Sequence, residues 1–524
     1  MKYPSLLLIP ILTSHTLFAP KVMALPQGAA VTHGDVRIAQ DAQRMVIQQA
    51  SERAIVQYSD FSIGQGETVD IQQPGAQSIL LNRVVGSSLS KLHGQLNSNG
   101  QVFLINPNGI LVGAQAQINV GGLLLTTHDI ADHDFLSNQF DFVGKKPSVI
   151  QIDGEIEVSP GSFVIVLAPD IELKGSIIAQ FGKVAMIAAD GASVLLKPGE
   201  WPQIQVTQAT YDAWIHHHGF IQAQGGMVEI TAASASDLID RVIFHEGTTD
   251  VSSMAIVEQD DQVFLRKSQV AINTNNTAGY IDVGGVIDAS GDKSDKRVDI
   301  EGEAVVVRKD ARILNNGGAE QGGGQTHILA DYLSVEKGAE IEAKGGAQGD
   351  GGFVELSGYD ELSLKGSVDT SAQRGKTGYL LIDPRNIEIN TAASTSINSF
   401  PTNGGVYAPT GNNATLDVAD LLTALSTNNV TVTTADNGAG NQAGNLTLAT
   451  DIDLDTIEGT PTLTLRSDNI LSIGGDIEDK DNDGVGGSAN IVLRATRDIQ
   501  MDTGTVIDAG NGTIKVNVTN GDFI

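Results

Sequence analysis

Short runs of alternating apolar and polar residues recur along most of the chain, and glycines separate them. One unit begins at Gly175, carries Ile177 and Ala179, and continues at Gly182 with Val184. Alternation over four to six residues is typical of a strand with one buried face, and glycine-rich stretches between such runs predict turns. The pattern therefore predicts many short strands.

These units repeat about every 20 to 28 residues. Their pivotal aliphatic residues are Ile156, Ile177, Ile221, Ile287, Ile313, Ile341 and Val368. They are separated by 21, 44, 66, 26, 28 and 27 residues, so the first three gaps are near one, two and three times 22. A unit of this size cannot bury its apolar face alone, so successive units must stack as coils. We therefore predict an all-β protein, a right-handed parallel β-helix with N-terminal capping strands between about residues 30 and 80. A β-sandwich is the alternative, but that fold does not explain why the same sequence unit recurs.

Composition narrows the range of partners. The chain has 524 residues, with 63 acidic against 32 basic side chains and a net charge of −31. Nucleic-acid binding needs clustered Lys and Arg that release counterions, and the sequence has no such cluster, so we expect no nucleic-acid partner. The chain also has no Cys, so its stability must come from stacked backbone and aliphatic burial rather than disulfides.

The first 24 residues differ from the rest. Lys2 gives a positive start, an apolar stretch runs from Leu6 to Leu12, and Val22 and Ala24 are small residues at the −3 and −1 positions of a cleavage site. This pattern predicts a secretory signal peptide over residues 1–24. The apolar run is far shorter than the ~20 residues that span a bilayer, so we expect an exported, soluble mature chain that does not span the membrane.

The strongest local signal is a turn. Asn106, Pro107, Asn108 and Gly109 follow the apolar run that begins at Val102. Proline fixes φ, and Asn-Gly tolerates positive φ, so the residues by themselves indicate a tight turn between two strands.

This segment resembles the secretion domain of two-partner secretion exoproteins, the filamentous haemagglutinin family, whose mark is Asn-Pro-Asn-Gly after Val-Phe-Leu-Ile. The stretches 58–64, 79–84 and 116–123 are similar to further phrases of that family. The family often carries a second motif, Asn-x-Asn-Leu. Its nearest counterpart here is Asn97 to Asn99, followed by Gly100 instead of Leu.

The resemblance implies a secreted surface exoprotein of a Gram-negative bacterium that passes through the periplasm. A partner outer-membrane β-barrel transporter with periplasmic modules would recognise its N-terminal domain, and the exported chain would act as an adhesin or haemagglutinin-like structural protein on an unknown surface receptor. The implied secretion-motif residues are Asn106, Pro107, Asn108, Gly109, Asn97 and Asn99. Whether the transporter contacts the Asn-Pro-Asn-Gly turn, or the turn only shapes the fold, is open.

We expect five segments along the chain. They are the signal peptide (1–24), the secretion domain (25–200), a β-helical shaft (201–390), a polar linker or loop (391–415) and further β-rich coils with one short helix (416–524). The helix is predicted from apolar residues at an i, i+3, i+4, i+7 spacing, namely Val418, Leu421, Leu422 and Leu425.

Metal-binding patterns are sparse. Asp479, Asp481 and Asp483 match the first half of a calcium loop, but Asn490 stands where an EF-hand has Glu. A solvated acidic turn is the alternative, and calcium is the one ion we consider as a cofactor on this pattern.

Two aromatic groups have competing interpretations. His216, His217 and His218 offer transition-metal ligands, but alternate residues of a strand face opposite ways, so at most two of them can share a site. Trp201, Tyr211 and Trp214 are expected to pack on an inserted loop rather than to form a ligand platform.

We expect no enzyme, because the sequence has neither a G-x-S-x-G elbow nor a phosphate-binding loop. The alternative from another class is a secreted β-helical polysaccharide lyase or hydrolase. It would need a basic groove for an anionic polymer, and the scattered basic residues do not indicate one.

Overall fold

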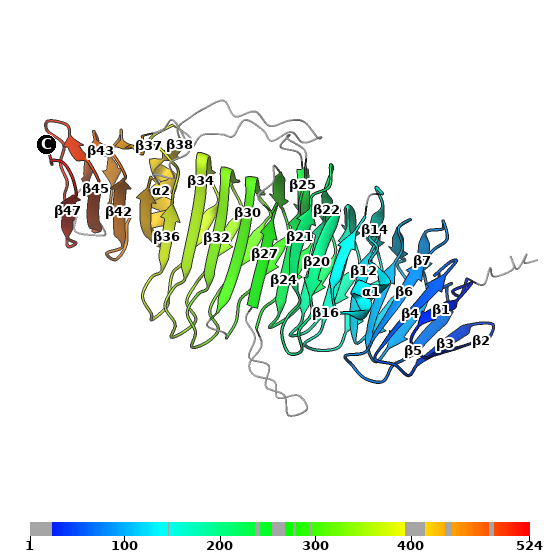
Figure 1. Cartoon of the computed structure of the whole chain (residues 1–524). Coiled ribbons are helices and arrows are strands. Elements are labelled where there is room, and N and C mark those ends of the chain that lie inside the picture. The colour runs from blue at the N-terminus through cyan, green and yellow to red at the C-terminus, as the bar shows by residue number, and fades with distance from the viewer. Residues whose placement is uncertain are drawn as a thin grey trace, which may run out of the picture.

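The computed structural model describes residues 24–144, 146–235, 241–253, 268–275, 279–292, 295–392, 414–434, 443–480 and 487–524. It is an elongated parallel β-helix, with the N-terminal strands at one end of the shaft and the C-terminus at the other (Figure 1). The predicted all-β, β-helical fold is thus confirmed. The predicted signal peptide lies outside the described residues except for Ala24.

Each coil places strands on three faces, which we name A, B and C, and strands on one face pair in parallel with those of the neighbouring coils. Face A consists of β4 (Arg53–Tyr58), β6 (Ile79–Val84), β9 (Gln101–Ile105), β12 (Gly122–Thr126), β16 (Phe163–Ala168), β19 (Lys183–Ala188), β24 (Met227–Ala232), β27 (Ser268–Asn273), β30 (Lys296–Val307), β32 (Gln325–Val335), β34 (Phe353–Leu364), β36 (Tyr379–Ile382), β39 (Asn429–Thr433), β42 (Thr462–Ser467), β45 (Asn490–Ala495) and β47 (Ile514–Val518).

Face B begins with β7 (Ser90–Leu92), β10 (Ile110–Val112), β14 (Val149–Ile152), β17 (Asp170–Leu173), β22 (Trp214–His217), β25 (Arg241–His245) and β28 (Tyr280–Val283). The longer strands β30, β32 and β34 then run through the corner from face A into face B without a break. Further along lie β38 (Ala414–Asp417), β37 (Ile387–Asn390), β40 (Leu446–Leu448), β43 (Ile470–Ile473) and β46 (Asp498–Met501).

Face C consists of β3 (Arg44–Gln49), β5 (Thr68–Gln72), β8 (Gln95–Ser98), β11 (Gln117–Val120), β15 (Glu155–Val158), β18 (Ser176–Ile178), β23 (Phe220–Gln222), β26 (Thr248–Asp250), β29 (Val286–Asp288), β31 (Arg312–Leu314), β33 (Glu340–Glu342) and β35 (Ser367–Asp369). Toward the C-terminus, β41 (Ile452–Asp453) and β44 (Ile477–Glu478) form a separate parallel pair.

The N-terminal end of the shaft is capped by two antiparallel strands. β1 (Ala30–His33) pairs antiparallel with β4, and β2 (Val36–Gln40) pairs antiparallel with β3. Parallel stacking starts with the next pairings, β3 with β5 and β4 with β6. The capping strands are therefore confirmed, and the antiparallel part is confined to β1 and β2 because residues beyond them already build coils.

The pivotal aliphatic residues form one ladder inside face C. Parallel register joins Ile156 to Ile177, Ile177 to Ile221, and each later residue of the series to the next. Between Ile221 and Ile287 the rung is Thr249. The reading of the gaps as multiples of 22 is thus wrong: the 44-residue gap is a single coil enlarged by an insertion, and the 66-residue gap holds two coils.

Each repeat unit begins with a glycine because the corner between faces B and C is tight. A Cβ on Gly175, Gly219, Gly247 or Gly285 would press on the carbonyl oxygen of the equivalent glycine one coil earlier. Backbone therefore stacks directly on backbone at this corner, which leaves no room for a side chain.

The predicted short helix is confirmed as α2 (Val418–Leu425), with Leu421 and Leu425 buried. The side chain of Asp417 accepts a hydrogen bond from the backbone amide of Ala419 at 2.9 Å, which caps the first turn. Of the predicted linker, residues 393–413 lie outside the described part. In the described residues, no helix is long and apolar enough to cross a membrane.

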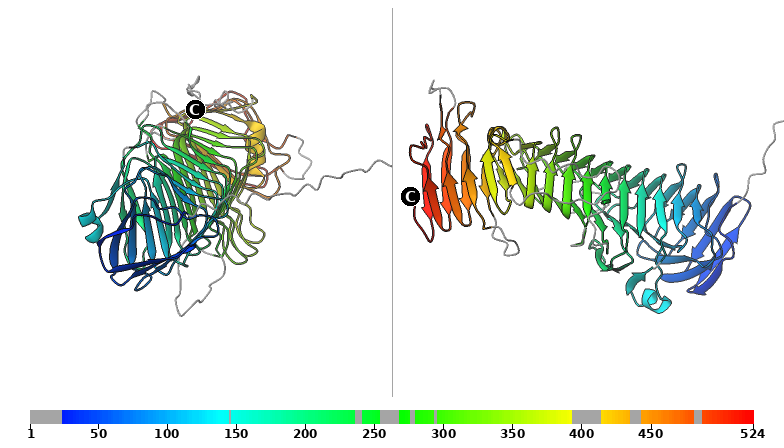
Figure 2. Two further views of the ribbon diagram at one scale, coloured as in Figure 1. Left: turned by 90° about the vertical axis from the view of Figure 1, so that its right-hand side faces the viewer. Right: turned by 90° about the horizontal axis from the view of Figure 1, so that it is seen from above.

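A second layer covers face A near the N-terminal end. It consists of α1 (Asp132–Leu136) and an antiparallel sheet of β13 (Phe140–Val143), β20 (Gly191–Leu195) and β21 (Gln203–Gln208). Figure 2 shows α1 standing outside the line of stacked coils. We call these elements the outer layer. The coils beneath it are buried on both sides.

Candidate functional site

The predicted turn lies at the corner between β9 on face A and β10 on face B. The backbone amide of Gly109 donates to the carbonyl oxygen of Asn106 at 3.0 Å, which closes the turn, and Gly109 adopts a φ of +107°. A Cβ at Gly109 would lie 2.9 Å from the carbonyl oxygen of Val149 in the next coil. Both the conformation and the space therefore require glycine here.

Asn106 is fully buried, and its amide group is saturated. Its Nδ2 donates to the carbonyl oxygen of Ser88 and to Oγ of Ser90, both at 2.9 Å. Its Oδ1 accepts from the backbone amide of Asn108 at 2.9 Å and from Nδ2 of Asn108 at 3.0 Å. The side chain thus joins the turn to the preceding coil and offers no free donor or acceptor to a partner.

The rest of the motif continues this link between coils. Nδ2 of Asn108 donates to the carbonyl oxygen of Gly86 at 2.9 Å, in the preceding coil. On the other side, Oγ of Ser148 donates to the carbonyl oxygen of Pro107 at 2.9 Å, from the following coil. The Asn-Pro-Asn-Gly turn therefore holds three successive coils in register.

The second asparagine pair lies elsewhere. Asn97 is in β8 and donates to Oδ1 of Asp70 at 2.8 Å, whereas Asn99 follows the strand. The exposed amide of Asn99 forms two 2.8 Å hydrogen bonds with the backbone N–H and carbonyl oxygen of Gln73. The structure therefore places the two asparagine motifs at opposite ends of β9 and does not bring them together.

The outer layer encloses a second hydrophobic core, which the repeat pattern does not predict. In β16, Val164 and Val166 point into the shaft, while Phe163, Ile165 and Leu167 point outward into this second core. The signal was present in the sequence, because runs such as Phe163 to Ala168 are apolar without alternation, which is typical of strands buried on both faces. The outer layer makes this part of the molecule more than a simple stack of coils.

Two arginines from face A hold the outer layer. Buried Arg83 of β6 pairs with Asp129 at 2.8 Å and with Asp132, and donates to the carbonyl oxygen of Ile130 at 2.5 Å. Arg53 of β4 donates to the carbonyl oxygen of Phe135 in α1 at 3.0 Å, and its guanidinium lies over that ring. The Arg83 side chain is buried, whereas the carboxylates of Asp129 and Asp132 are partly exposed, and these bonds fix where the segment that leads into α1 lies.

The three neighbouring histidines divide as strand geometry requires. His216 and His218 face outward, whereas His217 is fully buried inside the shaft beside His245, with ring centroids 4.8 Å apart. Both inner rings contact the Thr249 hydroxyl, at 3.2 and 2.9 Å. Burial lowers the pKa of His245 to about 4 and the pKa of His217 well below its usual value, so both rings are neutral at pH 7.

The remaining predicted positions are only partly described. Asp481 and Asp483 lie outside the described residues, so the calcium loop stays a prediction. Trp201 is half-buried and donates to the carbonyl oxygen of Phe181 at 3.2 Å. Trp214 lies in β22, a coil strand rather than an inserted loop, and packs edge-on against His216.

Comparison with known proteins connects this arrangement to a family. The family model described as TPS secretion domain, where TPS denotes two-partner secretion, matches residues 22–277, which include the asparagine turn and the outer layer. Residues 22–277 are a two-partner secretion domain. Such a domain implies a partner transporter in the outer membrane, and the relatives place the exoprotein among secreted proteins of Gram-negative bacteria.

A solved structure supports the assignment. The crystal structure of the HMW1 secretion domain from Haemophilus influenzae matches with a TM-score of 0.59 and 26% sequence identity, over 68% of this chain and 95% of that chain.

Two curated relatives match over a shorter stretch. A heme/hemopexin-binding protein of Haemophilus influenzae strain Rd is 40% identical over 106 residues, which is 20% of this chain and 12% of that protein. A second heme/hemopexin-binding protein of the same species is 39% identical over 118 residues, 22% of this chain and 13% of that protein. The match thus spans about an eighth of the relatives' length. None of these matches supports a polysaccharide lyase or hydrolase.

Proposed function

We propose that a partner outer-membrane β-barrel transporter with periplasmic modules recognises the N-terminal domain of the exoprotein and passes the chain, unfolded, from the periplasm to the outside. There it acts as an adhesin or haemagglutinin-like structural protein. The observation that carries this proposal is the TPS secretion domain at residues 22–277. The binding activities named for the heme/hemopexin-binding proteins are not carried over, because the aligned part is about an eighth of those proteins.

The physical character of the chain supports passage through a narrow pore. With no Cys, no disulfide can lock a loop before export, and a net charge of −31 opposes aggregation of the unfolded chain. Each coil pairs mainly with its neighbours, so folding outside the cell can start at one end and add coil after coil. Such stepwise folding would bias the movement outward.

The cap offers the transporter an edge. All four residues of β1 are exposed, and the strand is paired with β4 on one side. A strand with one open edge can accept another strand by β-augmentation. The proposal therefore places the first recognition contact at β1 and β2 rather than at the buried asparagine turn.

The export experiment tests the proposal directly. The full chain is expressed in a Gram-negative host with and without its partner barrel, and the exoprotein in the medium is quantified. We expect release only with the barrel. Release without the barrel, or retention in the periplasm with it, would refute export by two-partner secretion.

For the asparagine turn, we assign a role in shaping the fold. The Asn106→Ala substitution would remove all four side-chain hydrogen bonds and leave Ser90 and Asn108 without this partner, at a cost on the order of 3 kcal/mol. We expect less exoprotein in the medium and a lower urea midpoint for the exported fraction. Asn99→Ala, at an exposed position of the second asparagine motif, is the reference for stability alone and should cost about 1 kcal/mol.

The two roles separate cleanly in this pair of variants. If Asn106→Ala abolishes export while the purified full chain keeps the stability of the wild type, the transporter recognises the side-chain amide of Asn106 directly. In that case the assignment to folding is wrong.

A further inference from the structure

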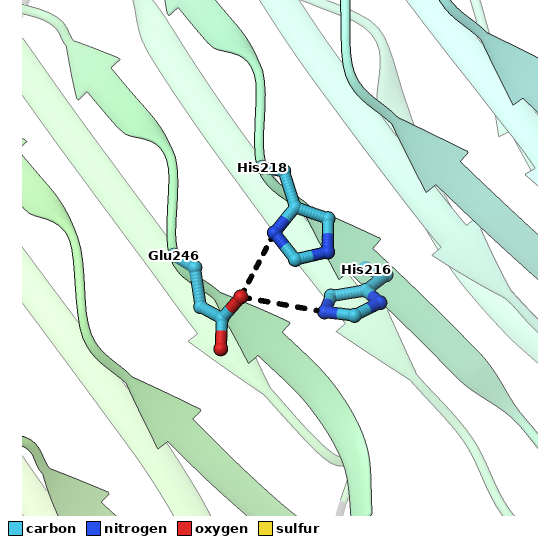
Figure 3. A group of neighbouring side chains, drawn as sticks. All are labelled: His216, His218 and Glu246. Carbon is cyan, nitrogen blue, oxygen red and sulfur yellow. Dashed lines mark ion pairs between the residues drawn. The ribbon is translucent and has the colours of Figure 1, made fainter.

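A second cluster of chemically competent side chains lies on the outer surface of face B, away from the asparagine turn. His216 belongs to β22, His218 follows that strand, and Glu246 follows β25 in the next coil (Figure 3). Residues at i and i+2 of a strand face the same way, which brings the two imidazoles to one side. The parallel register of β22 and β25 pairs His217 with His245, so Glu246, the residue after His245, lies beside His218.

The three ligand atoms already converge. Oε2 of Glu246 lies 2.8 Å from Nδ1 of His218 and 3.6 Å from Nε2 of His216, and one ligand atom from each of the three residues fits within 4.8 Å. In a four-coordinate zinc site with ligand bonds of about 2.0–2.2 Å, neighbouring ligand atoms lie roughly 3.3 Å apart. Small side-chain rotations are therefore enough to place one ion between the three atoms.

One nitrogen atom of the cluster is buried without a hydrogen bond to the described part of the chain, although buried polar atoms usually have one. Nε2 of His216 is buried and has no hydrogen-bond partner in the described residues, its contact with Glu246 being too long for one. The rings of Trp214 and Phe244 lie 5.0 and 4.5 Å from the His216 ring and shield it from water. A buried imidazole nitrogen without a hydrogen bond, 3.6 Å from a carboxylate oxygen and on a ring that lies against a second imidazole, is a suitable metal ligand.

The strands beneath the cluster hold it rigidly. β22 is paired in parallel with β17 on one side and with β25 on the other. Glu172 of β17 stands in register with His216 and adds negative charge, part of which Lys174 balances through a 2.7 Å ion pair. A site built on paired strands keeps its ligands close to their final positions before the ion arrives.

The geometry points to a binding site for a divalent transition-metal ion of the zinc type, with His216, His218 and Glu246 as its protein ligands. Two imidazoles and one carboxylate suit Zn²⁺, Ni²⁺, Co²⁺ and Cu²⁺ rather than Ca²⁺ or Mg²⁺. Three protein ligands leave a coordination position for water or for a group from another molecule. This assignment is independent of the proposed export route.

Titration of Zn²⁺ into the purified full chain, made without a polyhistidine tag, tests the site by calorimetry. We expect one ion per chain, and a loss of affinity of at least about tenfold in both His218→Ala and Glu246→Gln. His133→Ala is the matched control, because His133 also pairs with a carboxylate, that of Asp134 at 2.9 Å, on an exposed surface. The control should bind as the wild type does.

Two further readouts remove ambiguity. Co²⁺ in place of Zn²⁺ should give visible absorption bands that vanish in His218→Ala, and Cu²⁺ should quench the fluorescence of Trp214 beside the site. Urea unfolding without metal shows whether each variant is folded. Absence of Zn²⁺ binding by the folded wild type, or binding that His218→Ala and Glu246→Gln leave unchanged, would overturn the assignment and leave an ordinary histidine and glutamate ion pair.

Discussion

His128 lies between β12 and the outer layer, and its ring is almost completely buried. Its Nε2 lies 2.7 Å from the carbonyl oxygen of Ala189, and its Nδ1 lies 3.2 Å from the hydroxyl of Thr127. The carbonyl can only accept, so Nε2 carries the proton and Nδ1 accepts from the hydroxyl. Burial lowers the pKa of His128, although the carbonyl of Ala189 and the charge of Asp190 act in the opposite direction.

This residue predicts how the outer layer responds to pH. Because the folded-state pKa lies below the unfolded value of about 6.5, the unfolded chain binds a proton that the folded chain does not. The stability that neutral His128 contributes is therefore present above pH 6.5 and is lost as the pH falls below it. We expect hydrogen exchange of β13 and β20, corrected for its intrinsic pH dependence, to accelerate between pH 7.5 and pH 5.5.

The His128→Gln variant provides the comparison. Glutamine has no titrating group here, so the difference in exchange between the two pH values should shrink. An unchanged difference in His128→Gln would show that another group controls the outer layer.

At the scale of elements, the corner between faces B and C limits which substitutions the shaft can accept. A Cβ at Gly219 would press on the carbonyl oxygen of Gly175, so Gly219→Ala must push two coils apart. We expect a loss of about 1–3 kcal/mol, measured as a lower urea midpoint. Gly75→Ala is the control, since a Cβ there meets nothing within 4 Å. Equal urea midpoints for the two variants would mean that the corner can accommodate a methyl group.

Much of this element pattern was accessible from the sequence. Alternation identified the strands, and the series from Ile156 to Val368 identified the ladder, because each coil must present an apolar residue at the same inner position. Spacing alone could not distinguish an insertion from an extra coil. It therefore misjudged the gap between Ile177 and Ile221, where β20 and β21 leave the shaft to join the outer layer.

For the candidate site, the sequence predicts the turn but not the contacts that the turn makes with neighbouring coils. The turn at Asn106 to Gly109 followed from its residue types, since Pro and Asn-Gly have strong local preferences. The burial of Asn106 and its bonds to Ser88 and Ser90 depend on which coil lies next to the turn, and local sequence does not encode that. The same limit applies to Glu246, which joins His216 and His218 only through the register of two coils.

At the scale of the whole molecule, the shaft behaves as a linear array. Each strand of face C pairs with the strands of the coils before and after it, so stability is expected to pass from neighbour to neighbour. Ile313 in β31 is fully buried between Ile287 and Ile341. A charge at this rung should therefore uncouple the coils on either side.

The Ile313→Asp substitution turns this into a measurement. Burying a carboxylate without a partner costs several kcal/mol. The two tryptophans of the chain, Trp201 and Trp214, both precede this rung, so their fluorescence reports on the N-terminal coils alone, whereas far-UV circular dichroism reports on all strands. In urea, we expect part of the dichroism of Ile313→Asp to be lost first, with fluorescence changing near the wild-type midpoint.

The conservative variant shows whether the charge or the altered volume is responsible. Ile313→Val should cost only about 1 kcal/mol and keep the order of events seen in the wild type. If fluorescence and dichroism instead shift together by the same amount in Ile313→Asp, then destabilising one rung is felt by the coils around Trp201, far along the shaft. The molecule would then unfold as one cooperative unit, and coil-by-coil folding could not supply the outward bias proposed for export.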